Sequence, residues 1–193
     1  MDGTDIIAEA DTGTLGRDLR ALRLARGLTL EDMASRLDRS VGWVSQVERD
    51  LSTPRLSDVE AMATVLGVPL SILFGAAPAP AEEAGRIVRA RARRVVGERD
   101  RGLVESLLSP DLTDGFEVIH STFMPGARRV TPIRRPTTEL ATLIEGRLDL
   151  SFGEDWFTLE AGDSVRIREE PFRWANPYDR PAVAIWVISP PVY

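Results

Sequence analysis

The sequence lacks cysteine and lysine altogether, and it contains a single histidine, His120. Without cysteine, disulfides and thiolate metal sites are excluded. One histidine cannot supply the two or three imidazoles that zinc and non-haem iron sites usually need. Because lysine is absent, all 24 basic residues are arginines. Every cation is therefore a planar guanidinium that can hold a carboxylate or a phosphate through two parallel hydrogen bonds.

Long apolar runs and targeting segments are also missing. The longest apolar stretch, VPLSILFGAAPAPA at 68–81, is interrupted by proline and is too short to span a bilayer. Residues 1–14 carry four acids and no base, so they predict no signal peptide. We therefore expect a soluble, cytoplasmic protein that has no membrane partner.

Charge is spread unevenly along the chain. The net charge of −6 argues against nucleic acid when it is taken as a sum. Residues 15–56, however, hold eight arginines against six acids, a local balance of +2. The distribution matters more than the total for a nucleic-acid partner. With 193 residues and 43% hydrophobic content, the chain can form two small domains, each with a core of its own.

Residues 15–74 have the apolar spacing of a group of helices. Leu30, Met33, Ala34 and Leu37 recur at the interval of one helix face, and similar patterns precede and follow them. Thr29 with Asp32 three residues later, and Ser40, are typical helix starts. Gly27 and Gly67 stand where helices should end, and Asp38 stands in a turn that needs a left-handed residue. The pattern predicts four helices and a short fifth, LSILF.

The segment GLTLEDMASRLDRSVGWVSQVERDLSTP places a helix, a short turn and a second helix in sequence. Together with its flanks it resembles the XRE-type, lambda-repressor-like helix-turn-helix family over the whole five-helix domain. The resemblance implies that SVGWVSQVER is a recognition helix that enters the major groove of double-stranded DNA. Base contacts are expected from its outer face and phosphate contacts from helix ends and turns. The candidate DNA-binding residues are Thr29, Arg39, Ser40, Val41, Gly42, Trp43, Ser45, Gln46, Arg49, Thr53 and Arg55.

Beyond residue 85 the pattern changes from helical spacing to short, alternating stretches. The segment GAAPAPAEEAG has the Ala, Pro and Glu content of a linker. The later stretches, such as FEVIHSTFM, ELATLIEG and AVAIWVIS, are separated by turn sequences and predict an all-β barrel or sandwich. We expect a flexible acidic tail at 1–13, the helical domain at 14–75, the linker at 76–85 and the β domain at 86–193. For the arginine-rich stretch 86–101 there are two interpretations: a nucleic-acid patch or, as the family resemblance described next implies, the first strand of this β domain.

The segment from PGARRV to WVISP resembles the cupin family, which implies a double-stranded β-helix barrel. Metal-binding cupins carry two histidines and a glutamate in a first motif and a third histidine in a second. Counted from Gly126, the first two positions fall on Pro132 and Arg134, and Glu139 keeps the glutamate position. The third falls on Phe172 or Arg173. The resemblance thus implies a barrel without a transition metal or other cofactor, and His120 is interpreted as an ordinary strand residue.

An arginine in the barrel mouth requires a partner, because a buried unpaired charge is costly. Two alternatives stay open: Arg134 forms a structural ion pair with Glu139, or it binds an anionic effector such as a carboxylate. The candidate effector pocket consists of Arg134, Glu139, Phe172, Arg173, Trp174 and Trp186.

The two resemblances together imply an effector-responsive transcriptional regulator, not an enzyme, that dimerises through its cupin half. Two alternatives remain. The cupin could be a metal-independent isomerase or lyase that uses Glu139 as a base, or it could bind no ligand and serve only for dimerisation.

Overall fold

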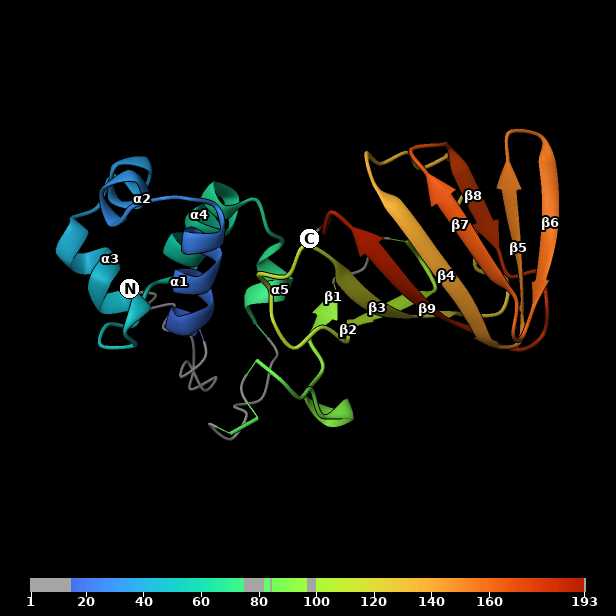
Figure 1. Cartoon of the computed structure of the whole chain (residues 1–193), viewed down its shortest axis with the longest axis horizontal. Coiled ribbons are helices and arrows are strands. Elements are labelled where there is room, and N and C mark those ends of the chain that lie inside the picture. Colours follow the sequence, from blue (N-terminus) through green and yellow to red (C-terminus); the bar gives the residue numbers. More distant parts are fainter. Residues whose placement is uncertain (1–14, 75–81, 84, 97–99, 193) are drawn as a thin grey trace, which may run out of the picture. The chain divides into compact units, whose positions relative to one another are not determined.

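The structure is a computed structural model that describes residues 15–74, 82–83, 85–96 and 100–192. The chain divides into two compact units (Figure 1). A helical unit extends to Arg94 and includes Pro110–Thr113, and a β unit consists of Val95–Ser109 and Asp114–Val192. The expected acidic tail, and residues 76–81 and 84 of the expected linker, lie outside the described residues.

The helical unit contains the five predicted helices. They are α1 (Leu15–Ala25), α2 (Leu30–Leu37), α3 (Val41–Glu48), α4 (Leu56–Leu66) and α5 (Leu70–Leu73). Each contributes one apolar face to a common core, because its apolar residues recur at helical spacing. The most deeply buried of them include Leu19, Leu22, Met33, Val44, Val47, Val59, Met62 and Ile72.

The helix ends are formed by the residues that the sequence indicated. Thr29 and Asp32 form a reciprocal capping box at the start of α2, and the Ser40 side chain accepts a hydrogen bond from the backbone N–H of Trp43 at the start of α3. Asp38 ends α2 in the left-handed region at φ 52°, and Gly67 ends α4 at φ 67°. These ends fix the length of α2 and the turn that leads into α3.

The β unit consists of two antiparallel sheets. A six-stranded sheet has the order β1-β2-β3-β9-β4-β7, and a three-stranded sheet has the order β6-β5-β8. The strands are β1 (Val95–Val96), β2 (Leu103–Leu107), β3 (Glu117–Phe123), β4 (Thr138–Glu145), β5 (Arg147–Phe152), β6 (Asp155–Glu160), β7 (Ser164–Arg168), β8 (Phe172–Ala175) and β9 (Ala182–Ser189). Sequence patterning indicated all of them except β8, whose four residues are too few to show alternation. This architecture confirms the predicted fold class of a helical domain followed by a cupin-like β domain.

Aromatic contacts join the inner faces of the two sheets. Phe123 of β3 meets Trp174 of β8 with ring centroids 4.8 Å apart, and Trp186 of β9 stacks on Phe172 of β8 at 6.2 Å. These rings lie beside buried aliphatic residues of both sheets, including Ile119, Ala141, Leu148 and Leu150. Aromatic and aliphatic side chains therefore make up most of the space between the sheets, and the aromatic rings also border the cavity described below.

The arginine-rich stretch 86–101 differs from its expected form as a first strand. It contains a short 3-10 helix, Ala90–Ala92, and only the two-residue strand β1. Residues before β1 belong to the helical unit because Arg94 pairs with Asp18 of α1 and donates to the carbonyl of Ile72. The division between the units thus falls later in the chain than the boundary expected at residue 86.

Candidate functional site

Helix α3 separates its side chains into a buried and an exposed face. Val44, Val47 and Glu48 are buried, whereas Val41, Gly42, Gln46 and the adjoining Arg49 are exposed and Ser45 is half-buried. The exposed residues follow one another at intervals of one, four and three, so they form a continuous stripe on a helix with 3.6 residues per turn. A short exposed helix of this kind has the shape that fits a major groove.

Other candidate DNA-binding residues lie at helix starts and in a turn. Thr29 and Ser40 are the exposed N-caps of α2 and α3, and Arg55 is the exposed N-cap residue of α4. Thr53 is exposed in the turn that precedes α4. Helix N-termini and their flanking turns offer backbone N–H groups and dipoles that favour phosphate oxygens.

Two of the candidate arginines are engaged within the protein. Arg39 pairs with Asp58 at 2.6 Å, and its guanidinium lies 5.2 Å from the centre of the half-buried Trp43 ring. The Arg49 Nε donates to the Ser45 carbonyl at 3.0 Å, which holds that side chain along the end of α3. These contacts orient the two guanidinium groups before any partner binds, which lowers the ordering cost of a later phosphate contact.

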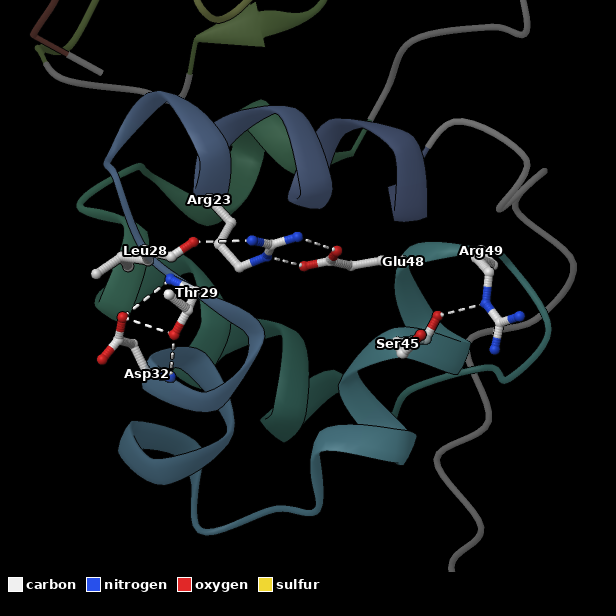
Figure 2. A network of polar contacts seen from close by, with 7 residues as sticks. All are labelled: Arg23, Leu28, Thr29, Asp32, Ser45, Glu48 and Arg49. Atoms are coloured by element: carbon white, nitrogen blue, oxygen red, sulfur yellow. Dashed lines mark hydrogen bonds and ion pairs between the residues drawn. The ribbon is translucent and has the colours of Figure 1, made fainter.

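A buried ion pair anchors α3 from behind (Figure 2). The Arg23 Nε and a terminal nitrogen donate to the two carboxylate oxygens of Glu48 at 2.6 and 2.8 Å, and the other terminal nitrogen donates to the Leu28 carbonyl at 2.8 Å. The Glu48 hydrogen bond raises the pKa of Arg23, against an opposing effect of burial. Sequence reasoning missed this pair, because charged residues are ordinarily assigned to the surface. The only available signal was that Glu48 follows Val44 and Val47 at core spacing.

The β unit has a cavity of about 40 Å³ between the ends of its two sheets. Its wall combines the aromatic residues Phe123, Phe172, Trp174 and Trp186 with aliphatic Leu103, Ile133 and Ile188 and with charged Asp100, Glu105, Arg129, Arg135 and Glu139. The volume offers room for about three water molecules, which corresponds to a ligand of a few non-hydrogen atoms.

The structure brings together four of the six expected pocket residues: Glu139, Phe172, Trp174 and Trp186. The two arginines were placed wrongly. Arg134 is exposed and donates to the backbone carbonyl of Glu169 at 2.8 Å. Arg173 lies between two inward residues of β8 and points to the opposite face, where it donates to Ser151 and lies 5.4 Å from the Trp156 ring centre.

The guanidinium beside Glu139 belongs to Arg135, at 3.4 Å. Glu139 is 2% exposed and also accepts a hydrogen bond from the Thr137 hydroxyl at 2.9 Å. Alternate residues of an extended segment face the same side, so residues 133, 135 and 137 share the inner side with Glu139. Counting back by twos from Glu139 would have selected Arg135 from the sequence.

The donor set around Glu139 does not fit a transition metal. The nearest alternating positions supply the alkyl group of Ile133 and the guanidinium of Arg135, and neither is a metal ligand. Over the parts of the chain that the structure describes, there is no group of three or more His, Asp and Glu residues that could hold a metal ion. His120 is half-buried on the opposite face of β3 from Ile119, which pairs with Trp186 in register.

Family comparisons match both units. The model of a helix-turn-helix domain matches residues 14–71, and the model of a cupin domain matches residues 119–188. The matched segments give the chain a helix-turn-helix domain and a cupin domain. The structural division into a helical and a β unit agrees with these two matches.

Three known proteins match most of the length of this chain. The HTH-type transcriptional regulator SutR of Escherichia coli is 29% identical over 153 residues, which cover 79% of this chain and 80% of that protein. An HTH_3 family transcriptional regulator from Vibrio cholerae has 22% identity and a TM-score of 0.43, and covers 93% of this chain and 97% of its own. The hydroxypropylphosphonic acid epoxidase of S. wedmorenis has 16% identity and a TM-score of 0.43, with 93% and 99% covered. No helix among the described residues is long and apolar enough to cross a membrane.

Proposed function

We propose that the protein is a cytoplasmic, dimeric transcriptional regulator that binds a specific DNA site through α3 and senses a small ligand in the cavity of its cupin domain. The observation that carries the proposal is the exposed stripe on α3, formed by Val41, Gly42, Ser45, Gln46 and Arg49. This stripe belongs to a helix capped at its start by Ser40. Its amide, hydroxyl and guanidinium groups are of the kinds that contact base edges and phosphates.

Within this stripe we assign base readout to Gln46. Its amide can make two hydrogen bonds to an adenine in the major groove. Gln46→Ala is expected to cost about 1–3 kcal/mol at one base pair and to relax the preference there. Thr64→Ala is the matched control, because Thr64 is exposed on α4 and its hydroxyl donates only to its own helix, at the Glu60 carbonyl.

The experiment selects binding sites for the full-length protein from random duplexes and then measures both variants on the selected site and its single-base mutants. A Gln46→Ala variant with unchanged affinity and unchanged ranking of all sites would remove Gln46 from base recognition. Arg55→Ala is expected to weaken binding to all duplexes and to lower the salt slope by about one, because it removes one phosphate contact. Duplex binding that persists after removal of residues 1–75 would contradict the whole assignment.

Dimerisation is proposed because a two-fold protein matches a near-palindromic operator with half-sites about one helical turn apart. The cupin domain offers a surface for it: Leu140 and Val187 pair in register on neighbouring strands and are 48% and 39% exposed although apolar. Burial of such residues against a second copy is favourable at about 25 cal/mol per Å².

The proposal does not assign an enzymatic activity. Glu139, the residue considered as a base, is held through one oxygen by Thr137 and Arg135. The donor set beside it does not fit a metal, so no reaction step is assigned to one.

A further inference from the structure

The charged groups of the cupin cavity carry more negative than positive charge. Asp100, Glu105 and Glu139 contribute three carboxylates, and Arg129 and Arg135 contribute two guanidinium groups. The formal charge of the wall is therefore −1. The expectation of an anionic ligand rested on Arg134 and Arg173, and both side chains lie outside the cavity.

The two cavity arginines are already engaged by groups of the protein. Arg129 pairs with Asp100 and also donates to the Thr131 carbonyl at 3.1 Å. Arg135 is directed at Glu139. An incoming anion would have to compete with these carboxylates for each guanidinium.

The carboxylates, in contrast, retain acceptor capacity. The hydroxyl of Thr137 and the guanidinium of Arg135 both reach Oε1 of Glu139, and among the described residues Oε2 has no hydrogen-bond partner. Glu139 as a whole is 2% exposed, and this second oxygen keeps a small accessible surface, so it is open to a molecule in the cavity. Glu105 accepts a hydrogen bond from Ser121 on Oε1 at 2.8 Å and likewise leaves its other oxygen without a donor in this part of the chain. A carboxylate oxygen that no protein group donates to leaves an acceptor site for a ligand that supplies a donor.

The remaining wall is aromatic. Phe172 and Trp186 stack on each other, and Phe123 and Trp174 meet edge to face. Aromatic faces attract cations through the ring quadrupole, and the attraction grows when water is excluded. An alkyl chain attached to the cation would pack against the same rings.

We propose that this cavity binds a small organic cation, a protonated primary amine whose ammonium group donates to Glu139 and Glu105 and whose alkyl chain contacts the aromatic wall. That such a cation acts as the effector rests on the proposed function; its binding to the cavity does not. The volume of about 40 Å³ limits the buried part to a few non-hydrogen atoms.

The test compares three probes of the same length and different charge: propylammonium, 1-propanol and propionate. Binding to the full-length protein is measured by titration calorimetry at constant ionic strength, without DNA. Propylammonium is expected to bind in the millimolar range, because so small a ligand makes few contacts, and to bind at least about tenfold tighter than the other two, a difference typical of one charge-assisted hydrogen bond.

Two isosteric variants locate the site. Glu139→Gln is expected to weaken propylammonium binding by about tenfold or more. Glu154→Gln makes the same chemical change in an exposed turn and should leave binding unchanged. If Glu139→Gln lowers the melting temperature of the protein, Glu105→Gln provides the same loss of charge on the half-buried strand β2.

Preferential binding of propylammonium that is lost in a cavity variant and kept in Glu154→Gln supports the proposal. It is overturned by propionate that binds as tightly as propylammonium, by the absence of propylammonium binding, or by equal binding to the Glu139→Gln and Glu154→Gln variants. DNA binding is measured separately on the selected operator. Cation binding without any effect of propylammonium on operator affinity would leave the cavity site intact and refute only its role as a sensor.

Discussion

The ion pair between Arg23 and Glu48 allows the most direct test of how α3 is held. We consider Glu48→Gln, which keeps the size of the side chain and removes its charge. The side chains of the pair are 7% and 4% exposed, so water screens the interaction little. Removing one member of a buried pair costs about 3–5 kcal/mol, because the other charge stays buried without compensation. The amide that replaces the carboxylate would retain one acceptor for Arg23, so we expect about 3 kcal/mol, at the lower end of this range.

The double variant Arg23→Met with Glu48→Leu separates the charge effect from packing. It removes both charges and fills the space with apolar groups, a replacement that often leaves the free energy of unfolding nearly unchanged. Here one cost remains, since the Leu28 carbonyl loses its donor from Arg23, and this amounts to about 1 kcal/mol. The double variant should therefore be more stable than Glu48→Gln alone.

Urea unfolding of the full-length protein, followed by far-UV circular dichroism of its helices, measures these differences. Glu83→Gln serves as the control, because it changes the same residue type in a pair whose arginine, Arg89, is 57% exposed, and it should leave the helical transition nearly unchanged. The reasoning is refuted if Glu48→Gln costs less than about 1 kcal/mol, the value typical of a surface pair, or if the double variant is the less stable of the two. Operator affinity should fall with Glu48→Gln, since the anchored face of α3 lies opposite its exposed stripe.

Three further predictions concern the helix cap, the metal content and the oligomeric state. Hydrogen bonds from the backbone and side chain of Thr29 lower the pKa of Asp32. The cap should therefore stabilise the fold above about pH 4 and lose its effect as the pH falls through the lower pKa of the folded state. The difference in melting temperature between the protein and Asp32→Asn should shrink at acid pH, and a difference that grows there would contradict this. Elemental analysis should find no stoichiometric zinc, iron, manganese or nickel, because Arg135 places a positive charge beside Glu139. About one equivalent of such a metal per chain, lost on Glu139→Gln, would bring back the enzyme hypothesis. A fragment of residues 86–193 should sediment as a dimer at micromolar concentration, and a monomer would refute dimerisation through the cupin half.

The helical domain could be predicted closely from the sequence because its signals are local. The capping box of Thr29 and Asp32, the left-handed Asp38 and the cap at Ser40 each depend on residues within a few positions of one another. The Arg23–Glu48 pair could not be predicted, since it joins α1 and α3 across the domain core and depends on where two separate helices meet.

In the β domain, the inward-facing residues of a strand could be predicted from the sequence. Which residues face inward in the irregular segment before that strand could not. Glu139 was placed correctly, but the alignment counted forward from Gly126 selected Arg134 instead of Arg135. The segment between them is irregular and meets the facing sheet only through isolated bridges, such as Ile133 with Phe172. A shift of one residue in such a segment turns every side chain to the other face. Asp100 and Glu105 were missed because they reach the cavity from segments that precede the cupin-like stretch, and Arg129 was missed although it lies within that stretch.

The small volume of the cupin cavity has a consequence for how any larger ligand could act. A molecule with more than a few non-hydrogen atoms can be buried completely only in a wider form of the barrel, in which the rings of Phe172 and Trp186 stand further from the facing strands. If that form is the minor one, the apparent affinity falls in proportion to its population. The preference of the ligand for the wider form over the narrower one sets the upper limit on the response, because a ligand shifts an equilibrium only by that preference. Substitutions that enlarge the cavity, such as Phe172→Leu, would thus raise affinity and weaken the response together.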